Sequence, residues 1–440
     1  MKHLASASLT PIASPVLAAL VCLGLCSCRT PQPSQAARLT PPQPSPRDLP
    51  AVDDLPPRHE DPDPLTMMDG TPVTTKDDWF LKRRPQIVRL VQHYFFGYAA
   101  PERLKQGTPP PTLVAEDPDT LDGAATWQHL RVPLAPDPDV YKDLYLLIPN
   151  TGDGPFPTIL TFGAPGRPNP KALATKDKAS LDPKEQGPLR DAAAAMRRGY
   201  AIAAFRHNQS SDNLYTRGIY PHYQPTADGP LIDHPFGARR LHDWGEIAAW
   251  SWCARRIIDV LEHDKRIDPH RIAIMGGSRT GPAAILTAVI DQRIAAVIAW
   301  QISPFRWREG EGPMQGAWAY WIGTAYSPFD QHRDRMPVEY TCFAAAVAPR
   351  PMLLTASPTA GFADPDKTAW IANGAAHAYR FLGCDVADFK PPWTEFGLRG
   401  NGPLRMHLRG GGHAYHPDDW PAYLDFLDEH VKPHPPQPRD

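Results

Sequence analysis

The segment 271–284 has the clearest chemical meaning in this sequence, because an apolar run leads there into a glycine-rich turn around Ser278. The turn reads Gly-Gly-Ser-Arg-Thr-Gly, and a stretch of small residues follows directly. A serine at such a strand-to-helix turn stands exposed at the edge of a sheet, and the N–H after it can bind an oxyanion. The usual pattern is G-x-S-x-G, whereas Gly281 comes one position late. We therefore predict a nucleophile, with a plain tight turn as the alternative; a phosphate loop is disfavoured because no Lys-Ser/Thr ending follows.

A candidate base for this serine is His413, which follows the glycine run Gly410–Gly412. A histidine on a glycine-rich loop after the last predicted strand can reach back over the edge of the sheet. The chain order, with the serine before the histidine, is that of α/β-hydrolases. His407 and His416 are expected to be structural, because neither follows the glycine run.

Short apolar runs alternate with longer helical segments around these residues. The predicted strands are 144–148, 158–162, 201–205, 272–275, 295–300, 352–355 and 404–408. The clearest predicted helices are 77–96, 244–262, 281–290 and 368–382. Short strands that are apolar on both faces, alternating with helices, argue for a mostly parallel sheet covered on both sides, which is an α/β fold. The irregular stretches 164–191 and 208–239 are predicted to be insertions of the kind that build substrate sites.

Composition narrows the class of protein. Hydrophobic residues make up 42% and charged residues 21% of the 440 residues, so a sizeable core is expected. A net charge of −2 argues against nucleic-acid binding, which normally needs a basic excess. The Pro-rich stretch 28–72 has few aliphatic residues, so it is predicted to be a disordered tether. We expect a single α/β domain over 73–432 and a flexible tail over 433–440.

The first 27 residues have the layout of a secretory signal. Lys2 precedes the apolar run Val16–Leu25, which is too short to span a bilayer. The exit Leu25-Cys26-Ser27-Cys28 resembles a bacterial lipobox, in which the last cysteine is lipidated. We predict a periplasmic or outer-membrane lipoprotein anchored at Cys28, with plain secretion as the alternative. Three other cysteines would remain, which excludes a disulfide scaffold, and no pair is spaced like zinc ligands.

The stretch Trp244–Ile302 resembles the glucuronoyl esterases, a family of α/β-hydrolases. The family motif is G-x-S-R-x-G-K, and this chain matches it except for Pro282 in place of the lysine. Weaker matches in the family's order extend the resemblance over about residues 77–432. The resemblance implies that Ser278 is the nucleophile, that Arg279 stabilises the oxyanion and that His413 is the base. It implies no metal and no cofactor.

The resemblance leaves the acidic partner of the histidine open. The family places its acid at one of two loops; here Gln301 occupies the first, and Thr359 and Ala360 fall at the second. The nearest carboxylate is Asp364, which we predict to be the acid; alternatively it caps the helix that begins at Pro365. The other candidates are Asp366, Glu309 and Glu311.

The resemblance implies a serine esterase that acts on a carbohydrate ester, most specifically a glucuronoyl ester of a plant or algal polysaccharide. Trp300, Gln301 and Trp307 are predicted to bind the substrate, and Trp318 and Trp321 are further candidates for stacking on a sugar. The alternatives are an acetyl-xylan-type esterase or a peptidase, and a catalytically weakened binding protein on the same fold. We expect a monomer with no nucleic-acid partner.

Overall fold

A computed structural model describes residues 49–98, 104–163, 191–207, 240–302, 321–413 and 416–432. The predicted signal segment, Cys28 and most of both predicted insertions lie outside the described residues, as do Trp307, Glu309, Glu311 and Trp318. No helix in the described ranges is both long enough and apolar enough to cross a membrane.

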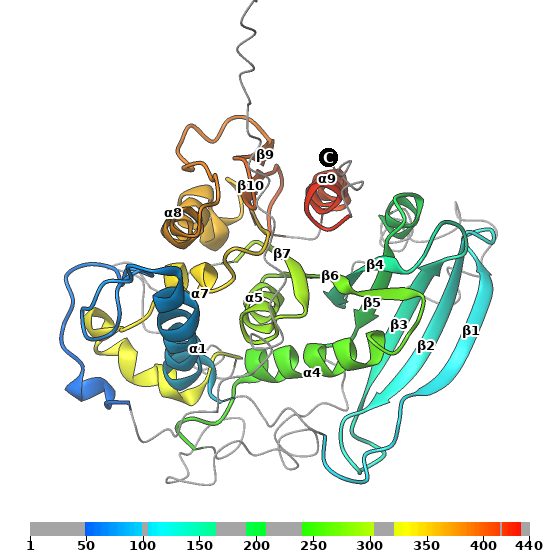
Figure 1. Cartoon of the computed structure of the whole chain (residues 1–440), viewed down its shortest axis with the longest axis horizontal. Helices are drawn as coiled ribbons and strands as arrows, with labels where there is room; N and C mark the ends of the chain where they lie inside the picture. The colour runs from blue at the N-terminus through cyan, green and yellow to red at the C-terminus, as the bar shows by residue number, and fades with distance from the viewer. Residues whose placement is uncertain are drawn as a thin grey trace, which may run out of the picture. The chain divides into compact units, whose positions relative to one another are not determined.

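The described residues form one ten-stranded sheet with the order β1-β2-β3-β5-β4-β6-β7-β8-β10-β9 (Figure 1). The strands are β1 Thr112–Thr120, β2 Ala125–Pro133, β3 Tyr141–Pro149, β4 Phe156–Phe162, β5 Ala201–Phe205, β6 Ile267–Gly277, β7 Ile294–Trp300, β8 Met352–Ala356, β9 Gly397–Arg399 and β10 Leu404–Leu408. The run from β5 to β10 is parallel, whereas β1, β2, β3 and β5 pair antiparallel and β9 adds an antiparallel edge. The predicted mostly parallel interior is therefore confirmed.

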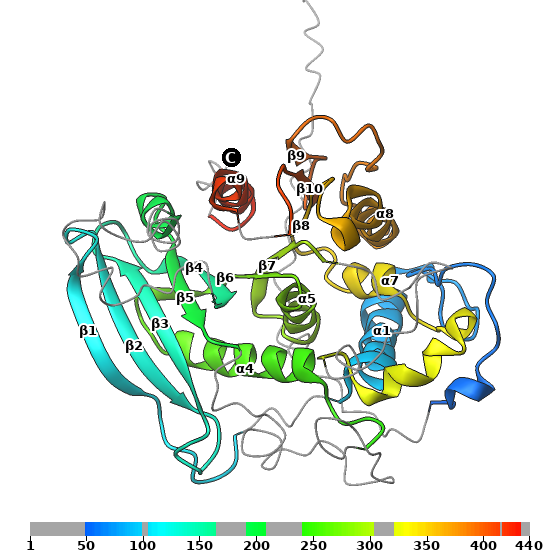
Figure 2. The same ribbon diagram turned by 180° about the vertical axis from the view of Figure 1, so that it is seen from behind.

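Helices cover both faces of the sheet (Figures 1 and 2). The longer ones are α1 Arg84–Val91, α4 Glu246–Leu261, α5 Thr280–Ile290, α7 Tyr340–Ala345, α8 Pro365–Phe381 and α9 Trp420–His430. The first five share one apolar core with the sheet, whereas α9 and the helical residues 191–197 share a second core on the opposite face. Strand β6 shows the cause: Ile272 and Ile274 belong to the first core and Ala273 and Met275 to the second, because successive side chains point to opposite faces.

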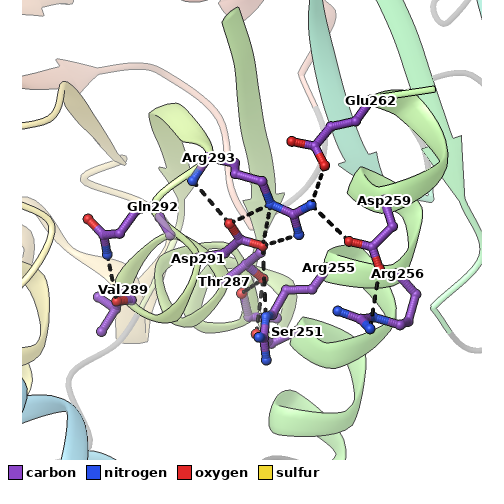
Figure 3. A network of polar contacts seen from close by, with 12 residues as sticks. Ser251, Arg255, Arg256, Asp259, Glu262, Thr287, Val289, Asp291, Gln292 and Arg293 are labelled. Atoms are coloured by element: carbon purple, nitrogen blue, oxygen red, sulfur yellow. Dashed lines mark hydrogen bonds and ion pairs between the residues drawn. The ribbon is translucent and has the colours of Figure 1, made fainter. Parts of the chain in front are cut away.

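Helix α5 follows the elbow, and its C-terminal end is tied down by arginines. Arg84 donates to the carbonyl of Val289 at 2.9 Å and Arg350 to that of Asp291 at 3.2 Å, and these carbonyls belong to the end of the helix, where intrahelical partners are lacking. Asp291 is the residue after the helix, and its carboxylate accepts hydrogen bonds from the Arg293 guanidinium (Figure 3). Oδ2 of Asp291 also lies 3.8 Å from Nε of Arg255 in α4. These contacts fix α5 and α4 at the edge of the sheet opposite to the elbow.

The secondary structure differs from the sequence-based expectation in several regions. The predicted helix 77–96 is a composite of a π-helix η4 Asp78–Arg83, the helix α1 and a π-helix η5 Gln92–Phe96. It ends at Gly97 as predicted, where φ is +76° and a Cβ would lie 2.3 Å from the carbonyl oxygen of Asp243. The edge strand β1 and its neighbour β2 were not predicted; β1 is exposed along most of its length and carries no alternating apolar pattern.

The segment predicted as a tether is packed in the part that the structure describes, residues 49–72. The buried Arg83 donates to the carbonyls of Pro64 and Asp63, both at 3.1 Å, and Tyr94 donates to that of Pro50 at 2.8 Å. Leu55 is buried in the first core. Composition misled here because the segment is held mainly by its backbone carbonyls, which satisfy buried donors of the domain.

We expect Asp291→Ala to lower the free energy of unfolding by about 3 kcal/mol, because it removes the carboxylate that Arg255 and Arg293 contact in a largely buried site. Asp388→Ala is the matched control, since its ion pair with Arg380 is exposed and should hardly change the unfolding midpoint. Urea unfolding at pH 7 measures both variants. Equal midpoints for the two would contradict the importance of the Asp291 network.

Candidate active site

The elbow at the end of β6 has the strand-to-helix context that the sequence predicts. Ser278 follows the strand directly with φ +53°, a left-handed conformation that is rare for residues other than glycine. The two glycines before it have no room for a side chain: a Cβ on Gly276 would lie 2.1 Å from the carbonyl oxygen of Thr280, and one on Gly277 1.8 Å from the ring of Trp300. The sharp turn that presents the serine therefore requires glycine at both positions.

Hydrogen bonds hold this turn from within. The backbone N–H of Ser278 donates to the carbonyl of Trp300 at 3.0 Å, and the hydroxyl of Thr280 donates to that of Gly277 at 2.8 Å. The late glycine of the motif has a packing reason of its own, since a Cβ on Gly281 would lie 2.3 Å from Cγ2 of Ile302. The spacing that departs from G-x-S-x-G is therefore a requirement of the contact between α5 and the loop after β7.

His413 lies opposite the serine, on the loop that follows β10. Its Nε2 is 3.0 Å from Oγ of Ser278, within hydrogen-bond reach for a general base. Burial lowers the pKa of His413 below its ordinary value, and the positive charges of Arg409 and Arg279 lower it further. The imidazole is therefore kept neutral at neutral pH, the state in which it can accept a proton. The structure thus brings together the two residues that the sequence paired.

Arg279 follows the serine and stacks on an aromatic ring. Its Cζ lies 4.2 Å from the ring centroid of Trp321, a cation–π arrangement that restricts the orientation of the guanidinium. The sequence suggested Trp321 as a sugar-stacking residue; the structure shows that one face of its ring contacts Arg279. No spacing pattern links the two positions, so this contact could not be predicted from the sequence.

The predicted substrate residues differ in their surroundings. Trp300 is partly exposed and its ring centroid lies 6.4 Å from that of His413, which places it beside the serine–histidine pair. Gln301 is fully buried with φ +50°, and its Nε2 donates to the carbonyl of Gly412 at 2.9 Å. This burial argues against the direct substrate contact that we predicted for Gln301. Trp307 lies outside the described residues.

The carboxylates proposed for the acid have other partners. Asp364 caps α8, because its Oδ1 accepts from the N–H of Lys367 at 2.8 Å and its Oδ2 lies 3.5 Å from the Lys367 ammonium. Asp366 accepts from Nε1 of Trp393 at 2.9 Å. Glu309 and Glu311 lie outside the described residues. The catalytic role of Asp364 stays a prediction, and the contacts shown are those of the helix cap that was its alternative.

Comparison with known proteins agrees with this geometry. A family model described as fungal glucuronyl esterase matches residues 238–383, which include Ser278 but not His413. A relative named carbohydrate esterase MZ0003, from an unknown prokaryotic organism, is 26% identical over 405 residues, 85% of this chain and 90% of its own length. A 4-O-methyl-glucuronoyl methylesterase of Schizophyllum commune is 23% identical and aligns with 83% of this chain and 79% of its own.

Solved structures share the fold over most of the chain. A glucuronoyl esterase from Solibacter usitatus superimposes with a TM-score of 0.70 at 24% identity, and the alignment covers 86% of this chain and all of that one. The parallel sheet, the elbow after β6 and the histidine loop after β10 define an α/β-hydrolase, as the sequence predicted. Within that class, the chain is similar in sequence to carbohydrate esterases and glucuronoyl methylesterases over most of its length.

The two roles of Asp364 are separated by Asp364→Asn. Asparagine caps a helix nearly as well as aspartate, so we expect stability and kcat to be retained in that variant. Asp364→Ala should lower the melting temperature through the lost cap. Steady-state kinetics beside thermal unfolding measure both effects. A fall of several orders of magnitude in kcat for the asparagine variant, at unchanged stability, would instead identify Asp364 as the acid.

Arg279→Ala should move the acid limb of the kcat/KM profile to higher pH. Arg279 is one of the cations that lower the pKa of His413, so its removal stabilises the imidazolium and raises that pKa. We also expect kcat to fall by about 10²–10³-fold, as for the loss of one oxyanion donor. Lys390→Ala, which removes an exposed cation paired with Asp388, is the control. An acid limb at the same pH in Arg279→Ala and the native protein would show that Arg279 does not lower the pKa of His413.

Proposed function

We propose that this protein is a serine esterase that hydrolyses a carbohydrate ester, and specifically a glucuronoyl ester. The observation that carries the proposal is the 3.0 Å contact between Oγ of Ser278 and Nε2 of His413 at a strained elbow. A hydroxyl is a weak nucleophile until an adjacent base takes its proton, and this contact supplies that base. The family match and the relatives named for glucuronoyl ester cleavage support the substrate class.

The reaction follows from the geometry in two stages. Oγ of Ser278 attacks the ester carbonyl while Nε2 of His413 takes the hydroxyl proton, which gives a tetrahedral oxyanion. His413 then returns the proton to the leaving alcohol as the carbonyl re-forms, which leaves the glucuronoyl group on the serine. Water attacks this acyl-enzyme by the same route in reverse and releases the free uronic acid.

The oxyanion is stabilised by Arg279 and by backbone N–H groups at the start of α5. A guanidinium stays cationic at every relevant pH and presents several donors, so it suits a charge that develops only in the transition state. The ring of Trp321 limits the freedom of this side chain before substrate arrives, which lowers the entropic cost of using it.

Two alternatives have specific observations in their favour. An acetyl-xylan-type esterase or a peptidase would use the same serine and histidine, and Pro282 stands where the family motif has a lysine on the substrate side. A weakened binding protein would explain why Gln301 and Thr359 stand at the two positions for the acid. A neutral, serine-bonded His413 favours the esterase over the binding protein.

Ser278→Ala should abolish hydrolysis of a 4-O-methyl-glucuronate ester while leaving the melting temperature unchanged or higher, because the substitution removes only a hydroxyl. Ser327→Ala, at an exposed serine outside the pair, is the control. The assay compares glucuronate, acetyl-xylan and aryl esters, so that the preferred ester identifies the substrate class. Turnover retained by a correctly folded Ser278→Ala variant would overturn the nucleophile; a preference for acetyl esters would overturn the glucuronoyl specificity.

We further propose that the protein is an exported lipoprotein, periplasmic or on the outer membrane. The support is the charged start, the apolar run Val16–Leu25 and the lipobox-like cysteine Cys28. Cys28→Ala should lose incorporation of labelled palmitate and leave the membrane fraction. Incorporation that persists would exclude Cys28 as the site, and export without any lipid would indicate plain secretion.

A further inference from the structure

The loop that carries His413 has an unusual set of hydrogen bonds: three consecutive backbone carbonyls each accept from a side chain. The carbonyl of Gly410 accepts from Nη1 of Arg409 at 3.2 Å. The carbonyl of Gly411 accepts from the Thr359 hydroxyl at 2.6 Å and also from that of Ser357. The carbonyl of Gly412 accepts from Gln301 at 2.9 Å and from Nη2 of Arg409 at 3.0 Å.

The donors come from the ends of three neighbouring strands, β7, β8 and β10 (Figure 2). Gln301 and Ser357 are fully buried and Arg409 is 4% exposed, so three of the four donors have fixed positions. Arg409 is itself oriented by Asp419, whose Oδ2 lies 3.3 Å from its Nε. Three of the four donors are therefore built into the core at the sheet edge, and Thr359 is the exposed one of the four.

Two of these donor positions are the places where the family resemblance predicts a carboxylate. Gln301 stands at the first and Thr359 at the second. A carboxylate at either place has only acceptor oxygens, so it could not make the bond to Gly412 or Gly411 that is observed here. These side chains therefore cannot do the work of the acid, but both contact the loop of the base.

We propose that Gln301, Ser357, Thr359 and Arg409 form a carbonyl clamp that positions His413 for catalysis. A run of three glycines has more backbone freedom than any other sequence, so the histidine would sample many positions without an external restraint. A displacement of about 1 Å of a catalytic group costs about 10²-fold in rate. The clamp holds the backbone of the loop, whereas a triad acid holds the imidazole ring. The proposal rests on the proposed function in that it takes Ser278 and His413 as the reacting pair.

The first test is whether substitutions of Gln301 lower or raise kcat. Gln301→Met and Gln301→Glu both remove the donor to Gly412 at nearly constant volume, so both should lower kcat by about 10²-fold with KM little changed. The carboxylate variant should not exceed the methionine variant, because its oxygens face a carbonyl. A rise in kcat for Gln301→Glu above the native protein would overturn the clamp and show that the position needs an acid.

The second test uses Thr359, which is exposed and tolerates substitution without risk to the fold. Thr359→Val is nearly isosteric but has no donor, and Thr359→Ser keeps the hydroxyl. Both variants are made in the Ser357→Ala protein, which lacks the other hydroxyl donor to Gly411. Relative to Ser357→Ala alone, the added Thr359→Val should lower kcat by about 10-fold or more, whereas the added Thr359→Ser should leave kcat unchanged. Equal rates for valine and serine, with equal melting temperatures, would overturn the proposal.

A readout without a sugar ester separates this proposal from the proposed function. The rate at which a fluorophosphonate labels Ser278 depends on the position of His413 but not on the carbohydrate. If the native protein labels rapidly yet cleaves no glucuronate ester, the proposed function fails, and slower labelling of Gln301→Met still supports the clamp. If the native protein and Gln301→Met label at the same rate, or if the native protein does not label, the clamp is wrong.

Discussion

The parallel hydrogen-bond ladder at the carboxyl edge of the sheet is the constraint on which the site depends. The ladder does not stop where the strands end: backbone N–H groups just past three strands donate to the neighbouring strand. These bonds are Ser278 to Trp300 at 3.0 Å, Gln301 to Thr355 at 2.9 Å and Arg409 to Ala356 at 3.0 Å. Each bond fixes the first residue after one strand against the neighbouring strand. The loops that carry Ser278, Gln301 and His413 therefore start from positions that are fixed relative to one another.

Packing at this edge depends on a small residue at the end of one strand beside a large residue at the end of the next. Gly277 at the end of β6 leaves the space that the ring of Trp300 at the end of β7 fills, and the two residues are register partners. A larger residue at the first position would displace the indole that lies beside His413. The elbow and the aromatic wall of the site are therefore one packing unit, and the arginine contacts beneath α5 and around Asp291 hold that unit from the other end of the sheet.

The sequence predicted the strands whose two faces are both buried. It also predicted the two catalytic candidates that lie next to glycine runs, Ser278 and His413. Strands β5 and β10 have the predicted bounds, and the Ser278–His413 contact was foreseen because elbow and loop each carry a local pattern. The contacts of Arg279 with Trp321 and of Gln301 with Gly412 join positions far apart in the chain, and no spacing rule connects them. The alternation rule also missed β1, which buries almost nothing, and composition alone could not show that residues 49–72 are packed through their carbonyls.

The left-handed backbone at Ser278 has a consequence for how such a protein evolves. Ser278 and Gln301 both have a left-handed backbone conformation, which costs a non-glycine residue on the order of 1–3 kcal/mol at each position. Glycine would relieve that strain at the elbow, and it would also delete the nucleophile. A population selected only for heat resistance would therefore drift toward chains that keep this sheet and lose its chemistry, so the persistence of a serine there in a lineage is itself a record of selection for turnover.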